Sequence, residues 1–264
     1  IFVGELSLDG RLRHISGILP IVMFAQEKKF QRIYLPEVNA AEASLIEDIE
    51  IIPVKDLKQL IYHLKGEKVI KPYKREYDLE SNNQTFTNDF AYIKGQEAAK
   101  RALEIAAAGA HNCLMIGPPG SGKTLLAKSL PSILPSLTRE EVLETTKIYS
   151  IAGLLPPDTP LISQRPFRSP HHTASHIALV GGGAWPKPGE ITLSHRGVLF
   201  LDEFPEFPRS VLESLRQPLE DGIVSIARAQ SSLTFPARFI LIAAQNPCPC
   251  GYLTDTQKQC VCTP

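Results

Sequence analysis

The sequence reads Gly117-Pro118-Pro119-Gly120-Ser121-Gly122-Lys123-Thr124 between a short apolar run and a predicted helix. This octapeptide fits the pattern G-x-x-x-x-G-K-[ST]. The apolar run 113–116 predicts a buried strand, and residues 125–130 predict the first turns of a helix. A loop in this setting turns backbone N–H groups toward phosphate oxygens. The alternative is a glycine-rich turn that binds no ligand; the full pattern in this setting favours a nucleoside-triphosphate site.

The octapeptide also supplies two side chains with expected roles. Lys123 would reach the β- and γ-phosphates, and the Thr124 hydroxyl would be a ligand of Mg²⁺. The candidate ATP-binding residues are Gly117, Pro118, Pro119, Gly120, Ser121, Gly122, Lys123, Thr124 and Leu125.

Two further predicted strands end in polar side chains. The apolar run 197–201 is followed by Asp202 and Glu203. Asp202 would hold the Mg²⁺ shell, and Glu203 would orient or deprotonate the attacking water; a buried strand can also end in an acid without such a role. The strand predicted at 239–244 precedes Asn246, which would sense the γ-phosphate or position water, or alternatively cap a turn.

Composition limits the class of protein. The chain has 264 residues, 43% of them hydrophobic, which suffices for one large or two ordinary domains. The formal net charge is zero, so any binding to nucleic acid must be local. No apolar run reaches the length of a membrane span and no signal peptide opens the chain, so we expect a soluble, cytoplasmic protein. Both ends of the sequence indicate a fragment.

Patterning divides the chain into three parts. Residues 1–70 alternate short strands and helices, as in an α+β or α/β piece. Residues 71–88 are polar and charged, with few aliphatic side chains, and predict a linker. Residues 89–264 alternate strands with helices, as a parallel sheet requires. Within them, the Gly-, Pro- and His-rich segment 151–196 is too long for a simple connection, and we expect it to be functional.

Four of the five cysteines lie close together near the end of the chain. Their pattern is C-x-C-x9-C-x-C, and paired thiolates in a loop can close a tetrahedral Zn²⁺ site. Free thiols and two disulfides are the alternatives. The candidate ligands are Cys248, Cys250, Cys260 and Cys262. The histidines have no spacing that requires a metal, and packing or backbone hydrogen bonds explain them.

Several segments together resemble the AAA+ ATPases, in their magnesium-chelatase-like branch, and within it the bacterial YifB/ComM family. The resemblance covers residues 89–262 densely and is more specific than the phosphate loop alone. It is carried by Gly95-Gln96, Lys100 to Gly109, His111-Asn112, Arg165 to Thr173, Gly181-Gly182-Gly183, Pro188 to Ile191, Leu201 to Phe207 and Asn246 to Gly251.

The resemblance implies a P-loop AAA+ core with a parallel sheet flanked by helices, and it implies that the protein works as a homo-oligomeric ring, a hexamer. It also implies two elements facing the ring's central pore. Trp185 and Lys187 would lie near the tip of one, and Arg228 at the tip of a hairpin between 222 and 236. Stacking with positive charge is how proteins grip single strands. Alternatively, Trp185 packs inward and Lys187 is solvated.

Residues 1–70 resemble the C-terminal part of the Lon-protease-like (ribosomal S5-like) domain that precedes the ATPase in this family. The match is carried by Gly4 to Arg11, Gly17 to Pro20 and Ile33 to Pro36. Leu19 stands where active Lon proteins have a lysine, and a Ser–Lys mechanism needs both nucleophile and base. We therefore expect no peptidase activity and a structural or docking role.

Three classes of function follow. The first is an ATP-driven motor on DNA, a branch-migration helicase of the competence type. The second is the ATPase subunit of a magnesium chelatase, and the third is a nucleotide-regulated scaffold. The Lon-like front part and the cysteine cluster favour the first class. The resemblance further implies a helical lid, with an arginine finger and a second sensor, beyond the residues given.

Overall fold

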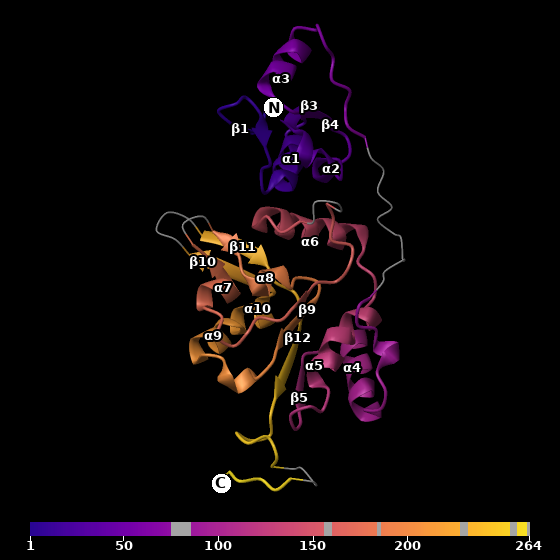
Figure 1. Ribbon diagram of the computed structural model, residues 1–264, viewed down its shortest axis with the longest axis vertical. Helices are drawn as coiled ribbons and strands as arrows, with labels where there is room; N and C mark the ends of the chain where they lie inside the picture. Colours follow the sequence, from indigo (N-terminus) through magenta and orange to yellow (C-terminus); the bar gives the residue numbers. More distant parts are fainter. Residues whose placement is uncertain (75–85, 156–159, 184–185, 228–231, 254–257, 263–264) are drawn as a thin grey trace. The chain divides into compact units, whose positions relative to one another are not determined.

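The computed structural model describes residues 1–74, 86–155, 160–183, 186–227, 232–253 and 258–262 (Figure 1). Packing groups them into two compact units. The first is Ile1–Ser81 with Thr138–Ile162, and the second is Asn82–Leu137 with Ser163–Pro264. Segment 138–162 lies inside the predicted 89–264 part but packs with the first unit. The domain boundaries expected from the sequence stay a prediction.

The first unit is built around a pair of parallel strands, β3 (Arg32–Pro36) and β4 (Glu50–Val54), with Ile33 opposite Ile51. Their apolar side chains pack on α1 (Ile18–Glu27) and α2 (Ala40–Ala43). An antiparallel hairpin of β1 (Glu5–Leu6) and β2 (Leu12–Arg13) precedes them, and α3 (Leu57–Leu64) follows.

Helix α6 (Arg139–Ala152) also belongs to the first unit, where it packs against α1. The spacing of Thr138 and Glu141 predicts a capping box at its start, and in the structure each of the two accepts a hydrogen bond from the other's backbone. It ends at Gly153, whose φ of 71° suits a glycine at a helix C-terminus.

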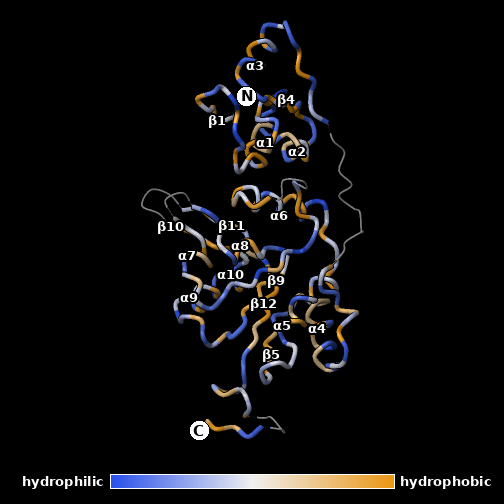
Figure 2. Tube along the Cα trace, viewed as in Figure 1, coloured by the Kyte–Doolittle hydropathy of each residue, from blue (hydrophilic) through white to orange (hydrophobic). Residues whose placement is uncertain are grey.

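The second unit contains a four-stranded parallel sheet. Its strands are β5 (Cys113–Ile116), β6 (Phe167–Arg168), β9 (Val198–Leu201) and β12 (Ile240–Gln245), in the order β5-β12-β9-β6. Strand β9 is fully buried, and Figure 2 shows that β9 and β12 carry mainly hydrophobic residues. Such runs are typical of parallel strands covered on both faces.

Successive side chains of β9 point to opposite faces of this sheet. Val198 and Phe200 join a core with α4 (Glu97–Gly109) and α5 (Lys123–Ser129). Leu199 and Leu201 join a second core with helices on the other side (Figure 1). The helices of that side are α7 (His176–Val180), α8 (Glu190–Leu193), α9 (Arg209–Ser214) and α10 (Arg216–Asp221). The predicted parallel sheet flanked by helices is confirmed.

Two antiparallel hairpins complete the second unit. One pairs β7 (Gly181–Gly182) with β8 (Lys187–Pro188), and the other pairs β10 (Ile223–Ala227) with β11 (Ser232–Pro236). Short 3-10 helices lie at Glu37–Asn39, Phe90–Tyr92, Leu130–Ile133 and Phe204–Glu206.

The sequence pattern of residues 209–219 predicts one helix, and this prediction is wrong in one respect, because the structure divides the helix at Leu215 into α9 and α10. Pro218 has no amide hydrogen to give to the carbonyl of Ser214, so one continuous helix would lose that bond. The sequence pattern of residues 40–47 also predicts a helix, but in the structure this helix ends early, at Ala43. Among the described residues, none of the helices is both long and apolar enough to cross a membrane.

Candidate nucleotide site

Three segments that carry predicted site residues leave the sheet at its carboxyl edge. The phosphate loop follows β5, Asp202 follows β9, and Asn246 follows β12. The register pairs Gln245 with Ile116, and Ala243 with Leu201, so the three strands end close to one another. Ligands of open α/β sheets bind at this edge.

The phosphate loop is folded around its own lysine. Gly120 and Gly122 have φ of 77° and 89°, a conformation that other residues rarely adopt. The Nζ of Lys123 donates to the carbonyls of Gly117 (2.7 Å) and Pro118 (3.0 Å) and to Oδ1 of Asn246 (3.3 Å). The lysine thus joins the phosphate loop to the end of β12.

Thr124 joins the phosphate loop to the end of β9 at the same edge. The hydroxyl of Thr124 donates to Oδ2 of Asp202 at 2.8 Å, although the two are far apart in sequence. The backbone N–H of Glu203 donates to Oδ1 of Asp202 at 3.0 Å. Glu203 itself has φ of 51°, and such strain in a non-glycine residue is often retained at functional sites. The structure therefore brings together Lys123, Thr124, Asp202 and Asn246.

One neighbour of Glu203, His172, is not predicted by the sequence pattern. Nδ1 of His172 lies 2.9 Å from Oε2 of Glu203. His172 is in contact with His171, their ring centroids being 4.1 Å apart, and meets Phe207 edge-on. The signal was present, because the His171-His172 pair stands in a segment that carries the family resemblance, but no spacing linked it to Glu203.

Gln96 is a second residue whose contact at the site the sequence pattern does not predict. Its Nε2 donates to the carbonyl of Ser121 at 3.1 Å. Gln96 is the residue that directly precedes α4, and its φ is 58°. Gln96 therefore links the start of α4 to the phosphate loop.

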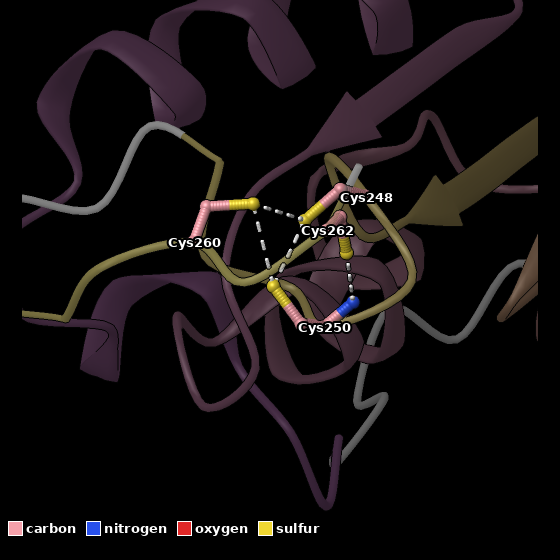
Figure 3. Close-up of side chains that lie close together, drawn as sticks. All are labelled: Cys248, Cys250, Cys260 and Cys262. Atoms are coloured by element: carbon pink, nitrogen blue, oxygen red, sulfur yellow. Dashed lines mark hydrogen bonds between the residues drawn. The ribbon is translucent and has the colours of Figure 1, made fainter. Parts of the chain in front are cut away.

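The four cysteines near the chain end form a second cluster (Figure 3). Their sulfur atoms all lie within 4.8 Å of one another. The Sγ of Cys248 is 3.3 Å from that of Cys250 and 3.7 Å from that of Cys260, and Cys250 and Cys260 are 3.6 Å apart. Hydrogen bonds from the backbone at Val261 and Tyr252 lower the pKa of the Cys250 thiol to about 6.

The predicted pore residues are placed only in part. Lys187 is exposed in β8, on a hairpin with β7. Trp185 and Arg228 lie outside the described residues, so their predicted positions are not addressed by the structure.

Family models give the relationship of the chain. The model of the magnesium chelatase subunit ChlI matches residues 89–264, and a further ChlI model matches residues 1–39. The chain belongs to the magnesium chelatase subunit ChlI family. This confirms the resemblance to the magnesium-chelatase-like AAA+ proteins. The phosphate loop and Asp202 of the candidate site both lie within the first match, residues 89–264.

Among individual ChlI-family relatives, the chain is 47% identical to competence protein ComM of Haemophilus influenzae, over 98% of its own length and 51% of the relative's. It is 45% identical to the YifB protein of Salmonella typhimurium, over 98% of this chain and 50% of that protein. It is 26% identical to a magnesium-chelatase 38 kDa subunit of Cereibacter sphaeroides, over 60% of this chain and 52% of that subunit. The chain thus spans about half the length of these relatives.

Proposed function

We propose that the full protein is an ATP-driven AAA+ motor that acts on DNA, with this chain supplying the ATP- and Mg²⁺-binding residues. The observation that carries the ATPase part is the convergence of the phosphate loop, Asp202 and Asn246 at one edge of the parallel sheet. Membership of a magnesium-chelatase-like AAA+ family supports the same activity.

The residues present fit Mg²⁺–ATP. The Oγ of Ser121 is buried in the phosphate loop and has no hydrogen-bond partner among the described residues, which is costly unless a ligand supplies one. Lys123 already faces oxygen acceptors, and phosphate oxygens would take their place. The hydroxyl of Thr124 and the carboxylate of Asp202 offer the oxygen ligands that Mg²⁺ prefers.

Each side chain then has a role in phosphoryl transfer. Lys123 binds the β- and γ-phosphates, and Thr124 and Asp202 hold Mg²⁺. Glu203 accepts a proton from the attacking water or orients it, and Asn246 senses the γ-phosphate. His172 holds the carboxylate of Glu203 in position.

The proposal of DNA as the partner is supported by the relatives. The curated name of one relative, which is 47% identical, is competence protein ComM, and competence is the uptake of DNA. Lys187 is exposed on its hairpin, where a basic side chain can meet phosphate. We propose that Trp185 and Arg228 join it on the pore of a homo-oligomeric ring, a hexamer, in the cytoplasm.

The second candidate is the ATPase subunit of a magnesium chelatase, favoured by the family match and by the 26% identity to a magnesium-chelatase 38 kDa subunit. The two candidates differ in what stimulates ATP hydrolysis by the full-length protein. We expect single-stranded or branched DNA to stimulate it. Stimulation only by a porphyrin-loaded partner subunit would contradict the DNA proposal. If neither stimulates hydrolysis, the result would favour the third class, a nucleotide-regulated scaffold.

ATP binding itself is tested with Lys123→Ala. Mg²⁺–ATP should raise the melting temperature of the wild type by mass action, and the substitution should abolish this rise. The ligand-free melting temperature should be nearly unchanged, because Lys123 bonds loop carbonyls and belongs to neither hydrophobic core of the sheet. A mutant that keeps full protection by ATP would contradict the site.

The DNA contact is tested with Lys187→Ala in the full-length protein. Because phosphate contacts carry no base information, DNA affinity should fall similarly for all sequences and its salt dependence should flatten. Lys128→Ala, which removes an exposed lysine on α5, is the matched control. Equal DNA affinity for both variants in a filter-binding titration would remove Lys187 from the interface.

Zinc is the third cofactor in the proposal. Four cysteine thiolates are a common ligand set of structural Zn²⁺ sites, and here their sulfurs all lie within 4.8 Å of one another. No peptidase activity is proposed for the first unit.

A further inference from the structure

The described residues after β12, 246–253 and 258–262, have no hydrophobic core of their own. None of the three cores of the described chain includes a residue beyond Ala244. Leu253 and Val261 are 60% and 83% exposed. Between 246 and 253 and between 258 and 262 there is no helix or strand. Something other than apolar packing must therefore hold this segment in one conformation.

The four cysteine sulfurs are close enough together to hold this segment by binding one metal ion. Two tetrahedral ligands at a Zn–S distance of about 2.3 Å stand about 3.8 Å apart. The three shortest sulfur–sulfur distances here, 3.3, 3.6 and 3.7 Å, are near that value. They are far above the length of a disulfide bond, about 2.05 Å. The side chains of Cys248, Cys250 and Cys260 point toward one another (Figure 3).

The same segment touches the phosphate loop at two points. Oδ1 of Asn246 accepts from Lys123, directly after Gln245 at the end of β12, whose carbonyl accepts from the N–H of Gly117 at 3.3 Å. Gly251 lies so close to Pro119 that a Cβ at this position would meet Cδ of the proline at 2.7 Å. Gly251 also donates from its N–H to the carbonyl of Cys248, which ties this contact to the first cysteine pair.

We propose that a zinc ion bound by Cys248, Cys250, Cys260 and Cys262 acts as a brace on the nucleotide site. It holds Asn246 against Lys123 and Gly251 against Pro119. This inference rests on the proposed ATP site. Without the ion, the segment loses its only strong cross-link among the described residues. The phosphate loop then loses the packing of Gly251 against Pro119. Binding of ATP then has to include the ordering of this segment, which lowers affinity.

The experiment uses full-length protein purified in reductant without added metal. Zinc content is measured by elemental analysis, and the affinity for ATPγS with Mg²⁺ by calorimetry. Wild type should hold about one zinc per chain, and Cys260→Ser should lose it. The dissociation constant of Cys260→Ser should rise about tenfold, because an ordered contact surface has been lost.

Three matched variants separate the steps. Cys113→Ser removes the one cysteine outside the cluster and should keep both zinc and affinity. Gly251→Ala should keep zinc but weaken the binding of ATPγS. The added Cβ would push against Pro119, and the φ of 84° at this position disfavours alanine. Lys123→Ala should keep zinc and lose ATPγS. If Cys260→Ser does not fold, zinc is instead removed from the wild type with a chelator and then added back. The affinity for ATPγS should fall when zinc is removed and recover when it is restored.

The outcomes are distinct. Wild type without zinc, with four titratable thiols in the cluster, would overturn the metal site. Loss of zinc with unchanged ATPγS affinity would overturn the brace. Zinc-loaded wild type that binds no ATPγS would overturn the proposed function and the brace together, and would leave the metal site standing.

Discussion

At the scale of single residues, Asp202 and Glu203 are adjacent in sequence but differ in their contacts. Asp202 accepts hydrogen bonds from Thr124 and from the backbone of Glu203. The Glu203 carboxylate faces His172 instead. This difference agrees with separate roles for the two acids, in which one holds Mg²⁺ and the other acts on water.

Substitution of the two acids tests this division in the full-length protein. Glu203→Gln keeps the size but removes the charge, so ATP should bind normally and turnover should fall by roughly 10² or more. Asp202→Asn should instead weaken the Mg²⁺-dependent part of ATP binding. Calorimetry with and without Mg²⁺, together with single-turnover rates, distinguishes them. Equal, small effects of the two substitutions would refute the assignment.

His172 gives a second prediction at this scale. If its Nδ1 positions Glu203, His172→Ala should lower kcat about tenfold while leaving the affinity for ATP unchanged. Asn at position 172 can place a donor near the same point, so His172→Asn should restore most of the rate. A structural role alone predicts that both variants lose stability and that Asn gives no rescue in steady-state kinetics.

At the scale of elements, a buried carboxylate joins three helices of the first unit. Oε1 of Glu42 in α2 accepts from the N–H of Leu19 in α1 at 3.1 Å and from the hydroxyl of Ser150 in α6 at 2.5 Å. Burial raises the pKa of Glu42, and these hydrogen bonds oppose the rise only in part. The attachment of α6 to the first unit therefore includes a polar contact as well as apolar packing.

The pH dependence of stability follows from that pKa. The folded state binds the proton of Glu42 more tightly than the unfolded chain does. Its contribution is therefore complete below the unfolded pKa and is lost as pH rises through the raised folded pKa. Glu42→Gln cannot titrate, so the free energy of unfolding should fall less from pH 4 to pH 8 than in the wild type. Urea unfolding at several pH values measures this; parallel pH profiles would contradict it.

At the scale of the whole molecule, α6 is part of the first unit although both its sequence neighbours belong to the second. Leu143 packs against the core of the first unit, and Ser150 bonds Glu42. A chain that begins at residue 89 would leave this face of α6 without its partner.

A split protein tests the consequence. Residues 1–74 and 86–264, produced together as separate chains, should copurify, because α6 in the second piece packs on α1 in the first. Leu143→Asp places a charge in that core and should separate the pieces on a sizing column. Glu140→Gln, on an exposed residue of the same helix, is the control. Pieces that elute separately without any substitution would show that this packing is too weak to matter.

The sequence by itself determined the local chemistry. The octapeptide at 117–124 predicts a strand, a loop and a helix, because glycines permit its backbone and apolar residues flank it. The runs before Asp202 and Asn246 predict buried strands whose ends carry polar groups, and the capping box at Thr138 marks the start of α6. These features depend on neighbours in the chain, so a pattern of residues reveals them.

Only the tertiary structure decided which distant side chains meet. The pairing of His172 with Glu203, the contact of Gly251 with Pro119 and the packing of α6 on the first unit leave no local pattern. They arise because parallel strands far apart in sequence end at one edge, and because α6 buries its apolar face where a partner is available. The division of 209–219 into two helices has a local cause instead, Pro218, whose missing N–H a count of apolar positions does not register.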